Sequence, residues 1–103
     1  MYIYNITFAA DAEIEQEVLT WLRREFLSGT ESEHLQYFTR PELMRVLGAA
    51  EAGTVSLALH LRADDKQDIE NWYADCGAAL FADAIDRWGD RIVFFPTTLE
   101  CLE

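Results

Sequence analysis

Histidine is the side chain best suited to acid–base chemistry near neutral pH, and this chain has two, His34 and His60. His60 follows Ser56 and Ala58 at alternate positions of an apolar strand pattern, so it is predicted to face away from the core. Asn5 has the same phase in the first strand pattern. We therefore predict a ligand-binding group of Asn5, Ser56 and His60, with the imidazole as a base or an anion-binding group. The alternative is a histidine that only hydrogen-bonds a neighbour within an interface.

Arg45 is the fourth candidate ligand-binding residue, because its guanidinium can bind a carboxylate through two parallel hydrogen bonds. In so acidic a chain, the other interpretation is that Arg45 pairs with Glu42 or with acids of the predicted helices. His34 lies in a polar connection beside Glu31 and Glu33, and we predict that it faces solvent.

Neither metal-centre nor covalent chemistry has a recognisable motif in this sequence. The two cysteines, Cys76 and Cys101, have no paired-ligand spacing with each other or with the histidines. Glycine spacing matches no phosphate-binding or dinucleotide-binding loop, and no nucleophile elbow surrounds Ser56 or Cys76. We therefore expect no metal site and no cofactor, and we predict that both cysteines are reduced thiols.

Periodicity predicts the elements that position these residues. Residues 2–8, 54–62 and 92–99 alternate or run apolar as strands do. Apolar residues at helical spacing predict one helix between Asp11 and Gly29 and another from Asp64 or Asp65 to Gly89. Asp11 is expected to cap the first helix, and Asp64 with Gln67 resembles a capping box for the second.

The segment 35–47 is ambiguous because Pro41 interrupts an otherwise apolar strand pattern. Proline cannot donate to a sheet, so a strand here is predicted to be an edge or bulged strand, as is 92–99 with Pro96. A short helix over Glu42–Leu47 is the alternative, and Gly48 to Gly53 is predicted to form a turn.

The order strand, helix, strand, strand, helix, strand predicts a single α+β domain with a ferredoxin-like fold over residues 1–103. Right-handed crossovers place both helices on one face of a four-stranded antiparallel sheet of order 4-1-3-2. The edges of that sheet are then the two strands that contain proline. The positions of the prolines therefore support this strand order independently of the periodicity.

Charge and composition exclude several classes of partner. The 103 residues carry 19 acidic and 8 basic side chains, for a net charge of −11, and such a field repels nucleic-acid phosphates and anionic lipid. No secretion signal or membrane-spanning apolar run is present in the sequence, so a cytoplasmic protein is expected.

Several stretches resemble a bacterial family, the domain-of-unknown-function family 4286. They are residues 1–7, the acidic helix with Trp21-Leu22, and the segments 43–47, 53–56, 87–89 and 94–100. The resemblance implies a ferredoxin-like fold related to dimeric α/β-barrel proteins, and it implies no particular reaction.

A sheet with helices on one face leaves its other face uncovered, and here that face is predicted to mix apolar, small polar and imidazole groups. We therefore expect a homodimer that pairs through this face or through edge strands, with a small-molecule ligand as a further candidate partner. The leading hypothesis is a binding or interaction module rather than an enzyme. The alternative is a cofactor-independent oxygenase or isomerase of the dimeric α/β-barrel type, a suggestion that comes from fold analogy alone.

Overall fold

The computed structural model describes residues 1–27, 32–48 and 52–102, which form a sheet of strands and a layer of helices. The strands are β1 (Tyr2–Asp11), β2 (Thr39–Arg45), β3 (Thr54–Ala63) and β4 (Ile92–Glu100), and the helices are α1 (Glu15–Leu22), α2 (Lys66–Trp72) and α3 (Ala78–Trp88). A π-helical turn, Arg23–Leu27, extends α1, and another, Tyr73–Gly77, joins α2 to α3. Short 3-10 turns cover Ala12–Ile14, Glu33–Gln36 and Gly89–Arg91.

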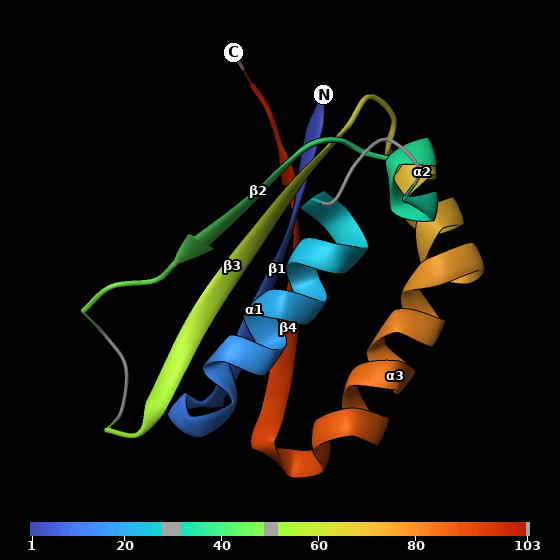
Figure 1. Ribbon diagram of the computed structural model, residues 1–103. Coiled ribbons are helices and arrows are strands. Elements are labelled where there is room, and N and C mark those ends of the chain that lie inside the picture. The colour runs from blue at the N-terminus through green and yellow to red at the C-terminus, as the bar shows by residue number, and fades with distance from the viewer. Residues whose placement is uncertain (28–31, 49–51, 103) are drawn as a thin grey trace.

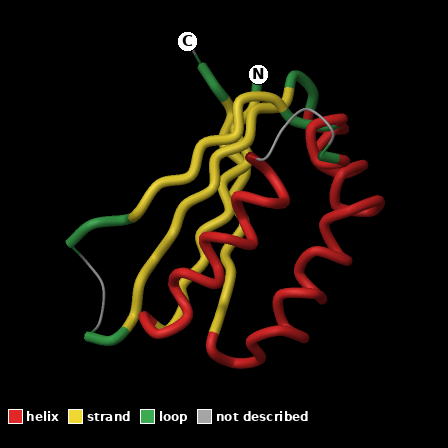
Figure 2. The backbone as a smooth tube through the Cα atoms, viewed as in Figure 1, coloured by secondary structure: helices red, strands yellow, loops and turns green. Residues whose placement is uncertain are grey.

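The sheet has the order β2-β3-β1-β4 with all neighbours antiparallel, which confirms the predicted ferredoxin-like topology. Figures 1 and 2 show the helices together on one face of the sheet, with the other face uncovered. The described helices include none that is long and apolar enough to cross a bilayer.

The core lies between the sheet and the helices, where strand alternation and helical spacing place their apolar side chains. Residues of β1 and β3 that share one face are fully buried, among them Ile6, Phe8, Leu59 and Leu61. The helices contribute large side chains to the same cluster, including Trp21, Phe26 and Trp72. Phe94 of β4 stacks on Phe81 of α3 with ring centroids 4.5 Å apart, so the last strand uses one of its apolar phases in the core.

Both prolines lie in edge strands, as predicted. Pro96 of β4 pairs only toward β1, and Pro41 lies in β2, where the register with β3 shifts between Thr39 and Glu42. Arg40, within this bulge, has a φ of 50°. The alternative short helix over Glu42–Leu47 is wrong, since Glu42 to Arg45 are strand residues.

Other local expectations need correction. Residues 33–36 form a 3-10 turn. The sequence predicts instead that a polar connection ends at His34 and that a strand begins at Leu35. Asp11 makes no side-chain cap, and its carboxylate instead accepts a hydrogen bond from Arg91 Nε at 3.0 Å. Asp65 is the residue that caps α2, by accepting from the backbone N–H of Gln67 at 3.1 Å. The predicted turn from Gly48 to Gly53 lies partly outside the described residues, at 49–51.

Candidate functional site

Three of the four predicted ligand-binding residues lie on the uncovered side of the sheet, which we call the open face. Asn5 of β1 pairs directly with His60 of β3, and Ser56 lies four residues before His60 on the same side of that strand. Asn5 Nδ2 donates to Thr7 Oγ1 at 3.1 Å, whereas Asn5 Oδ1 is buried and has no hydrogen-bond partner among the described residues.

Arg45 does not join this group, because it lies on the helix-covered side of the sheet. Its register partner Leu57 is fully buried beneath the helices. The guanidinium donates from Nε and Nη2 to Glu15 Oε2 at 3.0 and 2.8 Å. Arg45 therefore makes the pairing with a helix acid that the sequence offered as the alternative to ligand binding.

Large exposed apolar side chains flank the polar centre of the open face. On the β2 side, Met44 is 41% exposed and Val46, just after the strand, is 43% exposed. The backbone N–H of Val46 donates to the Ser56 carbonyl of β3. On the β4 side the exposed residues are Val93, Phe95 and Leu99. The open face therefore carries exposed apolar residues on both edge strands, together with the exposed carboxylate of Glu42 opposite His60, and polar residues along part of its two central strands.

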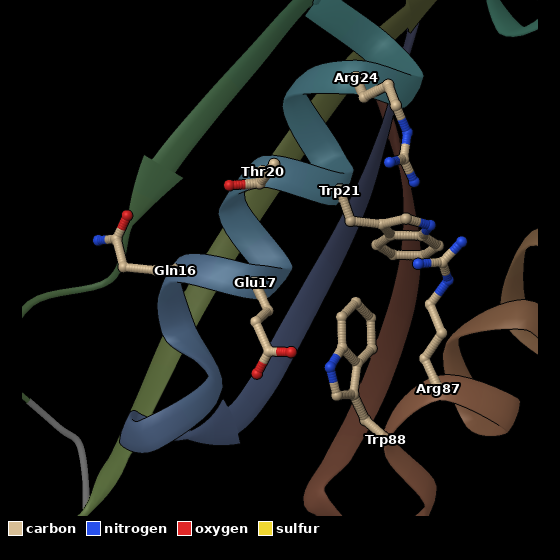
Figure 3. Close-up of a pocket in the computed structure, with 7 residues that line it drawn as sticks. All are labelled: Gln16, Glu17, Thr20, Trp21, Arg24, Arg87 and Trp88. Carbon is tan, nitrogen blue, oxygen red and sulfur yellow. The ribbon is translucent and has the colours of Figure 1, made fainter.

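A groove lies between α1 and α3 on the helical side (Figure 3). Its volume is about 510 Å³, and its lining residues are Gln16, Glu17, Thr20, Trp21, Arg24, Arg87 and Trp88. The Trp21 and Trp88 rings meet edge to face, with centroids 5.3 Å apart. Asp83 accepts from Trp21 Nε1 at 3.2 Å and from Arg87 Nε at 3.0 Å. The Arg87 guanidinium and the Trp21 indole of this groove therefore each have a hydrogen-bond partner within the protein.

His34 is buried, which corrects the expectation that it faces solvent. Only 2% of its surface is exposed, and its ring stacks on Phe26 with centroids 4.4 Å apart. The indole Nε1–H of Trp72 donates to His34 Nδ1 at 2.9 Å. His34 Nε2 is buried and finds no partner in the described part of the chain. Burial is the main cause that lowers the pKa of His34, while Glu25 and Glu33 act in the opposite direction.

The sequence signal for this arrangement was weak. Ser32 accepts from the backbone N–H of His34, a local cap that ends the polar connection and begins the 3-10 turn. A Ser two residues before His34 hints at such a turn, but the contact with Trp72 spans 38 residues of sequence. No local pattern reports a contact of that kind.

The family model described as "Domain of unknown function (DUF4286)" matches residues 1–102. The chain belongs to the DUF4286 family. No curated protein sequence matches this DUF4286 chain significantly.

Solved structures with similar folds share little sequence with this DUF4286 chain. One, from Deinococcus radiodurans, is described as a "putative antibiotic biosynthesis monooxygenase"; it is 16% identical with a TM-score of 0.71, over 100% of this chain and 94% of that one. Another is a dimeric ferredoxin-like protein from an uncultured marine organism, 12% identical with a TM-score of 0.64, over 100% and 96%.

A third structure is the de novo designed protein Foldit4, 14% identical with a TM-score of 0.58, over 97% of each chain. At these identities the likeness establishes the ferredoxin-like fold alone. A designed protein with the same fold illustrates that the fold by itself specifies no activity.

Proposed function

We propose that this protein is a homodimeric binding and interaction module whose two copies pair through the open face. The observation that carries the proposal is the set of exposed large apolar residues that flank the helix-free side of the sheet, namely Met44, Val46, Val93, Phe95 and Leu99. An exposed apolar patch of this kind on a small domain is typical of a protein interface. The fold neighbour described as dimeric is in keeping with it.

The open face approaches the size of a standard dimer interface. Strands about 30 Å long and about 4.8 Å apart give four strands a projected area of roughly 600 Å². Side-chain relief adds to this, and standard interfaces use about 800 Å² from each partner. Two such faces stacked about 10 Å apart bury their apolar borders against each other.

The polar centre of the open face suits a symmetric partner. A two-fold axis through the face brings the same residues of both copies together, so Asn5 and His60 of one copy lie near those of the other. Asn5 Oδ1 is buried without a partner in the described structure, and a donor from the second copy satisfies it. We place this dimer in a reducing, cytoplasmic setting, which suits the free thiols of Cys76 and Cys101.

The test is the oligomeric state of a variant that carries a charge in place of Phe95, one of the exposed apolar residues of the open face. Phe95→Glu introduces a carboxylate that dimerisation must desolvate, so the variant is expected to be a monomer by native mass spectrometry and light scattering. Ile85→Glu on α3 is the matched control, since Ile85 is 55% exposed and Phe95 is 57% exposed. The wild type and Ile85→Glu are expected to be dimers.

Two results contradict this function. One is a wild-type monomer throughout the micromolar range, and the other is a Phe95→Glu dimer as tight as the wild type. The second hypothesis is a cofactor-independent oxygenase or isomerase whose polar groups are Asn5, His60 and Arg45. Because Arg45 pairs with Glu15 on the helix-covered side, it is not available as a polar group of that site, and we rank this hypothesis second.

A further inference from the structure

A small cavity beside the start of α3 is lined by His34, whose Nε2 is buried and lacks a partner in the described structure. The cavity measures about 130 Å³ and is lined by Glu25, Glu33, His34, Cys76, Ala79, Leu80 and Asp83. One ligand-type atom each from Glu33, His34 and Cys76 lies within 4.8 Å of the others. A buried polar group without a hydrogen bond is costly, so this nitrogen points to something that binds there.

The hydrogen bond from Trp72 determines which ring nitrogen of His34 carries the proton. An indole N–H only donates, so His34 Nδ1 must accept from it with its lone pair. The neutral imidazole therefore keeps its proton on Nε2. The nitrogen beside the cavity is consequently a hydrogen-bond donor, and the Trp72 contact disfavours the doubly protonated ring.

This tautomer argues against a metal ion, although the residue types around the cavity suit one. A metal needs the lone pair of Nε2, and that nitrogen bears a proton as long as Trp72 donates to Nδ1. Cys76 adds to the argument, because burial, assisted by Glu33 and Asp75, raises the pKa of its thiol. A protonated thiol is a poor metal ligand.

Charged organic ligands also match the cavity poorly. Glu25, Glu33 and Asp83 line it, and the whole chain carries a net charge of −11, so an anion is repelled. An ammonium ion has no lone pair with which to accept from His34 Nε2–H. An uncharged oxygen remains as the complementary group.

One hydroxyl group fits both polar partners at once. A hydroxyl oxygen accepts one hydrogen bond and donates another. Two such bonds of about 2.8 Å at a tetrahedral oxygen join atoms about 4.6 Å apart. A ring nitrogen of His34 and a carboxylate oxygen of Glu33 lie within 4.8 Å of each other, so one oxygen can bridge groups at this separation. We propose that this cavity binds a small uncharged polyol, with one hydroxyl accepting from His34 Nε2–H and donating to the Glu33 carboxylate.

The cavity has room for about four water-sized groups, taking roughly 30 Å³ for each. Ala79 and Leu80 supply apolar lining for the carbon skeleton of such a molecule. A bound water provides the same hydroxyl chemistry, so the experiment must separate a polyol from water.

Glycerol is the probe, and long-range proton–nitrogen NMR of protein with ¹⁵N-labelled histidine is the readout. We expect His34 to be protonated at Nε2 and unprotonated at Nδ1, and its signals to shift saturably with a Kd of about millimolar size, as suits so small a ligand. Acetate and ethylammonium, matched roughly in size, are expected to leave these signals unchanged.

Glu33→Ala tests the second contact at an exposed position, and Glu70→Ala, an exposed acid of α2, is its matched control. Loss of a charge-assisted hydrogen bond is expected to weaken glycerol binding about tenfold or more in Glu33→Ala only. Absence of saturation identifies the oxygen as water and overturns the proposal. Equal affinity in both variants, comparable binding of either ion, or zinc binding through a deprotonated Nε2 overturns it as well.

Discussion

At the scale of single residues, His34 is the most deeply buried titratable group of the described chain. Its ring lies between Phe26 and Trp72, and the indole N–H occupies Nδ1 at 2.9 Å. Burial disfavours the imidazolium, and the Trp72 hydrogen bond adds to this effect because a protonated Nδ1 would face another donor. The folded protein therefore holds His34 neutral at pH values where a free histidine gains its charge.

The consequence is a loss of stability in mild acid. Because the pKa of His34 is lower in the folded than in the unfolded chain, below about pH 6.5 only the unfolded chain binds this proton. The contribution of His34 is present above that pH and declines as the pH falls toward the folded pKa. The slope is at most about 1.4 kcal/mol per pH unit. Urea unfolding at about pH 7.5 and pH 5.5 measures the change.

His34→Gln supplies the comparison, since glutamine is uncharged throughout this range. We expect the free energy of unfolding of that variant to depend less on pH than that of the wild type. His60→Gln is expected to keep the dependence that His34 causes. An identical pH dependence in the wild type and His34→Gln contradicts the assignment.

At the scale of elements, the π-helical turn between α2 and α3 is fitted closely around Trp72. Gly77 lies in this turn with helical backbone angles, and a Cβ built there meets ring atoms of Trp72 at 2.6 and 2.9 Å. Trp72 is fully buried and contacts Tyr4, Phe38 and Phe81, so the ring has no room to retreat. The absence of a side chain at Gly77 thus permits the indole position that orients His34.

Gly77→Ala is expected to destabilise the fold although alanine favours helices. Helix propensity alone predicts a gain of about 1 kcal/mol. Overpacking against Trp72 is expected to outweigh it and to give a net loss of about 1–3 kcal/mol in the free energy of unfolding, measured by urea titration.

Two further variants separate these effects. Ala82→Gly, at an exposed position of α3, is expected to show the ordinary propensity cost of about 1 kcal/mol. In a Trp72→Phe background the smaller ring relieves the contact, so Gly77→Ala is expected to cost less there. A stabilised Gly77→Ala single variant disproves the close fit.

At the scale of the whole molecule, dimerisation through the open face must overcome repulsion between two acidic copies. Each carries a net charge of −11, and acids such as Glu13, Glu17 and Asp86 lie on the helical side, whereas Glu42 lies on the open face opposite His60. Most of the repulsion is therefore long-range and screened by salt, whereas the apolar contact is not.

Raising the NaCl concentration from about 0.05 M to about 0.5 M shortens the Debye length from roughly 14 Å to roughly 4 Å. We expect the dimer dissociation constant to fall several-fold over this range, as measured by analytical ultracentrifugation. Phe95→Glu is expected to remain monomeric at both concentrations. A dissociation constant that rises with salt indicates an interface held by ion pairs and contradicts pairing through the apolar open face.

Sequence periodicity determined the elements and their arrangement. The alternation of Tyr4, Ile6 and Phe8, and of Leu57, Leu59 and Leu61, reports which side of each strand is buried, since side chains on a strand point to opposite faces in turn. Pro41 and Pro96 marked the edges because proline cannot donate to a second neighbour. The same alternation correctly placed Asn5, Ser56 and His60 together on the uncovered face.

Only the tertiary structure decided where His34 and Arg45 lie. The bulge between Thr39 and Glu42 interrupts the regular register of β2, and Arg45 pairs with Glu15, a residue 30 positions away. His34 is buried because Phe26 and Trp72, on two different helical segments, enclose it. Periodicity reports the local backbone and the side on which a residue points. Hydrogen bonds between residues tens of positions apart depend instead on how the finished layers pack, and no pattern within one segment encodes them.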